Sequence, residues 1–260
     1  MKKNNTFHLV YPSPWPIISG MMAISLSFGT INLFHNYDSS LFMASLLNLL
    51  MIMMLWWRDI IRESTFQGLH TLKVSMNIRM GMLLFITSEV FLFMSLFWSF
   101  FFSSLSPNIE LGMNWPPKEV MMFNPMQIPL LNTLILVSSG ITVTWSHFSM
   151  INNNYYQTMI SLLITIMLGM YFTILQGFEY MEAKFCMADS ILGSTFFMTT
   201  GMHGMHVMIG NILLTTCLLR HMKNHFSSTH NVGFESAIWY WHFVDVVWLF
   251  LYISMYWWSK

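Results

Sequence analysis

Residues 81–102 read GMLLFITSEVFLFMSLFWSFFF and carry one charged side chain in 22, that of Glu89. An apolar run of this length is typical of a membrane-crossing helix, because about 20 residues at 1.5 Å each cover the ~30 Å hydrocarbon layer. Glu89 lies about 13 Å beyond Met80 along such a helix. The stretch therefore predicts a transmembrane helix with a carboxyl group near the middle of the bilayer.

Similar apolar runs recur along the whole chain of 260 residues, of which 55% are hydrophobic and 8% charged, where soluble domains carry about 25% charged residues. Lipid cannot satisfy backbone N–H and C=O groups, so each run should be an α-helix. We expect an all-α, polytopic transmembrane bundle in a single integral membrane domain, residues 1–260. Its seven predicted spans are approximately residues 15–34, 40–57, 80–105, 128–151, 156–178, 190–219 and 236–258.

The connections between these spans are short except for two. Residues 58–79 mix charges with apolar side chains, and residues 106–127 are proline-rich and read as an ordered surface loop. The polar N-terminus has neither the apolar core of a secretory signal nor the Arg-rich pattern of a transit peptide, so we expect no cleavage.

Charge and cysteine content exclude some function classes. Eleven Lys and Arg balance eleven Asp and Glu, which gives no indication of a nucleic-acid partner. Cys186 and Cys217 are far apart in sequence and form no metal-binding pair.

The basic residues predict the orientation of the chain. With the N-terminus inside and seven spans, most of the Lys and Arg residues fall on the inner side, as the positive-inside rule requires. The C-terminus then lies outside. The inner set is Lys2, Lys3, Arg58, Arg62, Lys73, Arg79, Arg220 and Lys223, and the outer set is Lys118, Lys184 and Lys260.

Two acids lie deep inside predicted spans, Glu89 and Asp245. A charge near the bilayer centre costs at least about 2.5 kcal/mol, so such a residue has a partner or a role. Glu89 either handles protons or is a protonated carboxyl that hydrogen-bonds a neighbouring helix or lipid. Only Thr87 and Ser88 accompany it, which does not support a proton pathway along one helix.

Histidines appear at helical spacing in two spans. His242 lies three residues before Asp245, on one helix face, and the pair could hydrogen-bond to another span. His203 and His206 repeat the spacing in GMHGMH. Haem or copper ligation would need ligands from other helices, so we favour interhelical hydrogen bonds for both histidines and expect no metal site.

A further cluster of polar and aromatic side chains is expected at the inner membrane surface. Such clusters either bind anionic lipid head groups or only set the topology. Its members are Trp56, Trp57, Arg58, Arg62, Glu63, His70, Arg220, His221, Lys223 and His225.

Several motifs, in order along almost the whole chain, resemble subunit III of mitochondrial cytochrome c oxidase. They are HLVYPSPWPI, WWRDIIREST (56–65), SEVFLF (88–93), WPP (115–117), NPMQIPLLNT (124–133), YFTILQGFEY (171–180), GSTFFMTTGMHGMHVMIG (193–210) and WYWHFVDVVWLFLY (239–252). Several such blocks together are specific, although each alone is weak.

The resemblance implies a non-catalytic core subunit of the oxidase, which transfers electrons from cytochrome c to oxygen and pumps protons. It implies the mitochondrial inner membrane, with the N-terminus in the matrix and the C-terminus in the intermembrane space. Subunits I and II would carry the haems and coppers, so this chain should have no redox centre and no catalytic residue. Smaller accessory subunits and membrane phospholipids would be its other partners.

Family members separate their first two helices from the other five by a V-shaped cleft that holds phospholipids. By resemblance, Glu89 matches the buried glutamate of the SEVF motif and would face this cleft. The resemblance also favours lipid binding over simple charge sorting in the inner cluster, and it implies support of proton uptake and stabilisation of subunit I. The expected lipid-binding residues are Trp57, Arg62, Glu63, His70, Glu89, Arg220, Lys223 and His225.

Two other functions fit the polar residues. A proton-coupled transporter would use Glu89 and Asp245, but broken helices or inverted repeats are not evident. A redox protein would use His203 and His206, and absorption spectra with metal analysis of the isolated chain would identify it.

Overall fold

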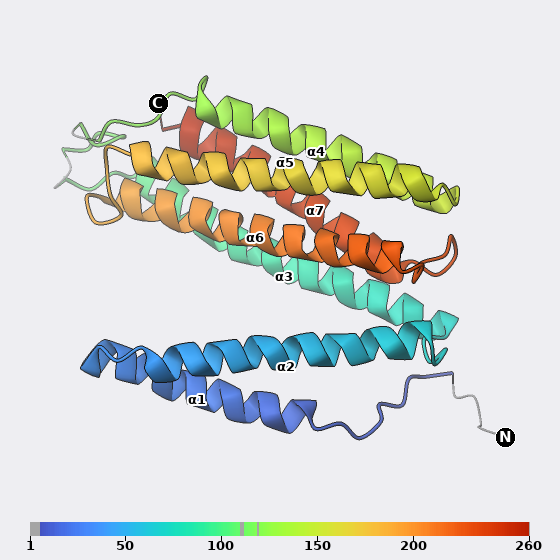
Figure 1. Cartoon of the computed structure of the whole chain (residues 1–260). Coiled ribbons are helices and arrows are strands. Elements are labelled where there is room, and N and C mark those ends of the chain that lie inside the picture. The colour runs from blue at the N-terminus through green and yellow to red at the C-terminus, as the bar shows by residue number, and fades with distance from the viewer. Residues whose placement is uncertain (1–5, 110–111, 119, 260) are drawn as a thin grey trace. The chain divides into compact units, whose positions relative to one another are not determined.

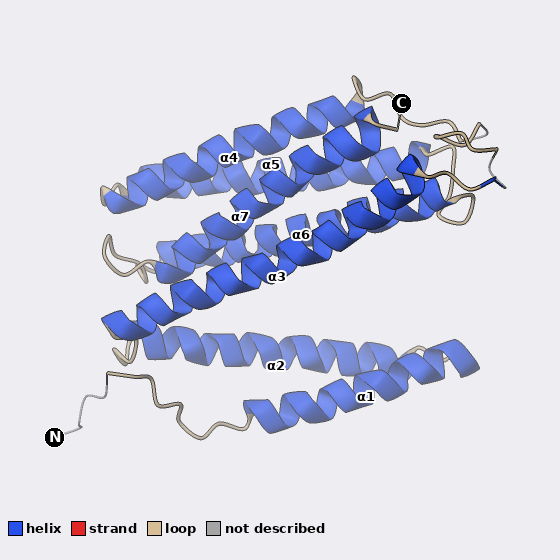
Figure 2. Cartoon of the chain, turned by 180° about the vertical axis from the view of Figure 1, so that it is seen from behind, coloured by secondary structure: helices blue, strands red, loops and turns tan. Residues whose placement is uncertain are grey.

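The structure, a computed structural model, describes residues 6–109, 112–118 and 120–259. Within these ranges every regular element is helical and no strand occurs (Figure 2). Seven helices are long and apolar enough to cross a membrane. They are α1 Trp15–Asn36, α2 Ser40–Thr65, α3 Leu72–Leu105, α4 Ile128–Ile151, α5 Tyr155–Glu182, α6 Ile191–Met222 and α7 Val232–Leu251, which continues into the π-helix η2 Tyr252–Trp257. The all-α fold with seven spans is confirmed.

Local sequence signals fix several helix ends. Pro129 occupies the first turn of α4, where its missing N–H costs nothing and its fixed φ suits a helix. The Ser190 side chain caps α6 by accepting the backbone N–H of Gly193 at 3.2 Å. α1 ends at Asn36, and the next residue, Tyr37, has a left-handed φ of 56° that stops the helix.

The predicted connection at residues 58–79 is wrong for most of its length, because it is largely helical. α2 continues to Thr65 and α3 begins at Leu72, so only residues 66–71 join them. Hydropathy marks where a helix meets water but not where its backbone bonds end, and the charged residues here are compatible with helix. The other long connection, residues 106–127, contains no long helix in its described part.

The chain groups into two compact units, Met1–Ile78 and Arg79–Lys260. The single membrane domain stays a prediction. In the first unit α1 and α2 lie side by side and antiparallel (Figure 1). The N-terminal segment is tied to the end of α2, where Trp15 Nε1 donates to Asp59 at 2.8 Å and His8 Nε2 lies 3.2 Å from Glu63.

The second unit contains most of the buried core. α5 packs between α4 and α6, and α7 contacts both α4 and α6 (Figure 1). In the apolar window of α7, 56% of the residues are buried, against 6% in that of α3. Large aromatic side chains fill the interior, including the fully enclosed Trp241, Trp248 and Phe196. α7 is therefore the central helix of this unit.

Candidate functional site

The side chain of Glu89 on α3 points to α6, where it meets His206. Glu89 Oε2 lies 2.9 Å from His206 Nε2, a hydrogen-bond distance. The Glu89 side chain is 22% exposed and that of His206 only 7%. The carboxyl at the centre of the 81–102 stretch thus has a partner on a neighbouring span.

The second nitrogen of His206 fixes the tautomer of its ring. Nδ1 lies 2.7 Å from the carbonyl oxygen of Met202, one turn earlier on α6. A carbonyl accepts only, so Nδ1 carries a proton and donates it. The contact between Nε2 and Glu89 then holds one further proton, either on a neutral Glu89 or on an imidazolium beside a carboxylate.

Aromatic rings pack around the His206 side of this pair. The His206 ring centroid lies 5.1 Å from that of Phe93, 6.2 Å from Tyr240 and 6.1 Å from Phe243. His206 is therefore packed against rings of α3 and α7 as well as bonded to Glu89.

His203 bonds to a different helix from His206. Its Nε2 donates to the carbonyl oxygen of Val244 on α7 at 3.2 Å, and the residue is fully buried between the rings of Phe172 and Trp248. The two histidines therefore join α6 to α7 and to α3, respectively. Within the described residues, no group of three or more His, Cys, Asp or Glu side chains is placed to hold a metal ion.

Asp245 lies against α4. Its Oδ2 sits 3.7 Å from His242 Nδ1, which is beyond a good hydrogen bond. A Cβ atom added to Gly140 on α4 would come within 2.8 Å of the same oxygen. Asp245 Oδ1 is buried and has no hydrogen-bond partner among the described residues. The glycine thus makes room for the acid. Among the described residues, neither His242 nor Asp245 forms a hydrogen bond to another span.

The predicted lipid-binding residues other than Glu89 fall into two groups, one in each unit. In the first unit Trp57 is 54% exposed, while Glu63 meets His8, whose ring packs edge-on against that of His70 at 5.8 Å. Arg62 has a mostly exposed side chain, 3.8 Å from Asp59.

In the second unit the Arg220 guanidinium stacks on the Phe226 ring at 4.3 Å, and its Nε is buried without a partner among the described residues. Lys223 is exposed close by in sequence. Burial, together with the charges of Arg220 and Lys223, lowers the pKa of His225, which lies beyond the end of α6. At neutral pH the positive charge of this group is therefore carried by Arg220 and Lys223.

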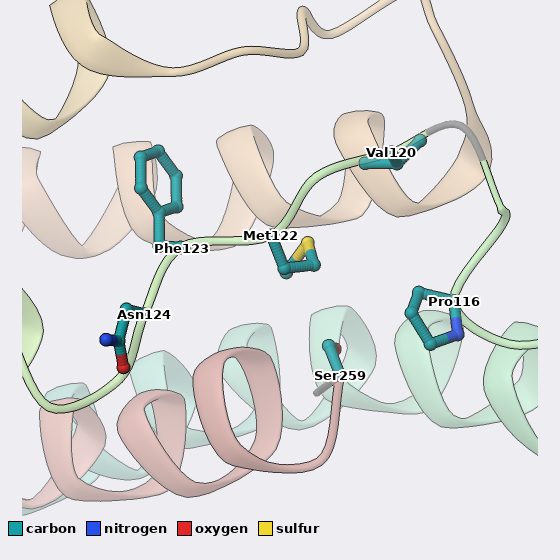
Figure 3. A pocket seen from close by; sticks show the side chains of 6 residues that line it. All are labelled: Pro116, Val120, Met122, Phe123, Asn124 and Ser259. Carbon is teal, nitrogen blue, oxygen red and sulfur yellow. The ribbon is translucent and has the colours of Figure 1, made fainter.

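Two features of the second unit were not predicted: a buried acid at the end of α5 and a hollow beside the loop that precedes α4. Glu179 is fully buried in the last turn of α5, and the predicted span stopped at residue 178, one position before it. A surface hollow of about 380 Å³ is lined by Pro116, Val120, Met122, Phe123, Asn124 and Ser259 (Figure 3). None of the predicted site residues lines this hollow.

The seven apolar helices define a multi-span integral membrane protein. Hydrogen bonds of His203 and His206 join three of these helices. The chain belongs to the family described as cytochrome c oxidase subunit III, whose sequence model matches residues 5–260. Members of this family are subunits of an oxidoreductase complex, which implies that the chain assembles with other subunits.

Relatives cover essentially the entire chain. Cytochrome c oxidase subunit 3 of Aedes aegypti is 59% identical over 257 residues, 99% of this chain and 98% of the relative. The proteins of the same name from Drosophila melanogaster and Coturnix japonica are 58% and 55% identical, each over 98% of both chains. The resemblance inferred from the sequence motifs is confirmed.

Proposed function

We propose that this chain is a non-catalytic core subunit of cytochrome c oxidase in the mitochondrial inner membrane. It stabilises subunit I, holds structural phospholipids and supports proton uptake, while subunits I and II carry the haems and coppers. Smaller accessory subunits complete the assembly. The full-length family match supports the assignment to the oxidase.

The lipid proposal rests on Arg220, which is partly buried and lacks a hydrogen-bond partner at Nε among the described residues. Its half-buried guanidinium forms no salt bridge within the described residues, and its Nε is an unpartnered buried donor. A buried cation without a counter-ion is costly, and a guanidinium matches the oxygens of a phosphate. A phospholipid head group would supply the missing anion, with Lys223 beside it at the membrane surface.

Lipid analysis of the purified complex tests this proposal. We expect Arg220→Ala to lower the amount of co-purifying anionic phospholipid, and Arg220→Lys to restore only part of it, because Lys cannot bond bidentately. Lys184→Ala is the control, since Lys184 is an exposed cation in the loop that follows α5. Unchanged lipid content in Arg220→Ala would contradict the proposal.

The Glu89–His206 pair supports a role in proton handling. One proton lies at the 2.9 Å contact between the two side chains, and we propose that it rests on Glu89 at neutral pH. The acid then donates to His206 Nε2, while His206 Nδ1 donates to Met202. Both groups are satisfied without a net charge, and a proton can move between them over a short distance.

Infrared difference spectra of the complex test the position of this proton. We expect Glu89→Gln to remove a protonated-carboxyl band, and His206→Gln to shift that band because the acceptor changes. Loss of an ionised-carboxylate signal in Glu89→Gln would instead place the proton on His206 and refute a neutral Glu89.

A further inference from the structure

Glu179 is a second enclosed acid, on a different helix from Glu89. The residue is 1% exposed, and neither carboxyl oxygen has a hydrogen-bond partner among the described residues. Its neighbours are well satisfied: Tyr180 donates to Thr200 Oγ1 at 2.7 Å, and Gln176 Nε2 donates to the Thr200 carbonyl at 2.9 Å. The lack of partners at Glu179 therefore lies within an otherwise well-bonded contact between α5 and α6.

The hydroxyl of Tyr256, in the continuation of α7, faces the carboxyl of Glu179. Tyr256 is 1% exposed, and its hydroxyl also lacks a bond of good geometry within the described chain. The Tyr256 ring packs among aromatic neighbours, 5.5 Å from Phe196 and 6.0 Å from Trp248. The carboxyl and the phenol thus face each other in a cage of rings.

A change of helix type positions Tyr256. Residues Tyr252–Trp257 form a π-helix at the end of α7, and π-helical turns are rare and occur often at functional sites. Each residue of an α-helix advances by about 100°, so one extra residue in a turn rotates everything after it by that angle. The π-helix therefore sets which side chain of the C-terminal segment faces α5.

The surroundings of Glu179 disfavour an ionised carboxylate. The side chain lies in the last turn of α5, where the helix dipole presents its negative end. No cation forms a salt bridge with Glu179 in the described part of the chain. Burying an unpaired carboxylate is far more costly than burying a neutral acid. A bound metal ion would need more oxygen ligands than one carboxyl and one phenol.

We propose that Glu179 and Tyr256 form a buried proton-binding site, in which Glu179 is a neutral carboxylic acid and Tyr256 is its hydrogen-bond partner. The site lies at the end of α5 nearest to the loop at residues 183–190, apart from the Glu89–His206 pair on α3 and α6. Its ligand is a proton. Uptake and release of the proton require the carboxyl to reach water.

Infrared difference spectroscopy of the purified complex at neutral pH tests the site. Glu179→Gln should remove a protonated-carboxyl band and leave the band assigned to Glu89 unchanged. Glu182→Gln is the matched control: Glu182 is exposed in the same helix turn, and its loss should remove only an ionised-carboxylate signal. If Glu179→Gln instead removes a carboxylate signal, or no carboxyl signal, the proposal is overturned.

Tyr256→Phe tests the pairing and does not depend on how well the Glu179 variant assembles. This variant keeps Glu179 and the aromatic packing but removes the phenol oxygen. The protonated-carboxyl band should shift to higher frequency, since a carboxylic acid that loses its hydrogen-bond partner has a stronger C=O bond. In D₂O the carboxyl proton of the wild type should exchange slowly, so the deuterium shift of the band should develop slowly. A spectrum identical to the wild type would show that Tyr256 is not the partner.

Discussion

Gly169 on α5 sits where a side chain has no room. A Cβ atom there would collide with the Asn211 side chain on α6 and come within 2.6 Å of the Trp241 ring on α7. We expect Gly169→Ala to lower the free energy of unfolding by about 1–3 kcal/mol, the usual cost of an overpacked core. Denaturation of the detergent-solubilised complex would measure it. Gly177→Ala is the control, because nothing lies within 4 Å of its added Cβ on the same helix.

Asp189 organises the turn before α6, outside the membrane spans. Its carboxylate accepts the backbone N–H of Cys186 at 2.6 Å and the Cys186 thiol at 3.0 Å. These bonds lower the pKa of Asp189. The carboxylate therefore stabilises the turn at every pH above the ordinary Asp value of about 3.9, and the effect is lost as the pH falls through the lowered pKa.

The expected result is a pH-dependent protection of the Cys186 amide against hydrogen exchange. Protection relative to Asp189→Asn should be greatest at neutral pH and should disappear in acid, because a protonated Asp and a neutral Asn are alike as acceptors. Equal protection in the two proteins at neutral pH would contradict the role of the carboxylate.

Between elements, one hydrogen bond ties α4 to α7. Trp241 Nε1 donates to Ser139 Oγ at 3.0 Å, and both residues are fully buried. Ser139→Ala leaves the indole N–H unsatisfied, which should destabilise the protein by about 0.5–2 kcal/mol in a membrane setting. Ser138→Ala is the matched control, because among the described residues the Ser138 hydroxyl bonds only to the Ile135 carbonyl of its own helix. An equal loss of thermal stability in both variants would contradict the interhelical role.

How far the elements could be predicted depends on which physical signal marks them. The length of the apolar runs predicts the spans well: α4 begins and ends at the predicted residues, 128 and 151. Hydropathy does not report backbone hydrogen bonds, so it missed the helical ends at Thr65 and Leu72. It also ended the fifth span before Glu179, since an acid at the end of an apolar run reads as surface. The π-helix has no composition signal at all.

In the candidate site, too, the sequence predicts some features and not others. Helical spacing predicts that His203 and His206 share a face, because that follows from 3.6 residues per turn. It does not predict that His203 bonds to Val244 and His206 to Glu89, because helix packing decides which neighbour each side meets. Sequence alone thus identified Glu89, His203 and His206 as polar residues inside spans, and the tertiary structure shows which partner each one has.

For the whole molecule, the orientation in the membrane is a prediction that chemical labelling can test. The positive-inside count uses Lys2, Lys3 and Lys260, which lie outside the described residues, so it stays a prediction. The structure offers a test that avoids them. α6 crosses between the loops at residues 183–190 and 223–231, which must therefore lie on opposite sides. Each loop can report on one side of the membrane.

The two native cysteines suit this test. Cys186 is exposed in the first loop, and Cys217 is buried in α6. With the N-terminus in the matrix, a membrane-impermeant maleimide should label Cys186 from the intermembrane space. In a Cys186→Ser background, a cysteine introduced as Thr229→Cys, at an exposed position of the second loop, should react only in inverted vesicles. Cys217 should react only after denaturation. Labelling of the two loops from the reverse sides would invert the topology and place Arg220 and Lys223 in the intermembrane space, against the positive-inside rule.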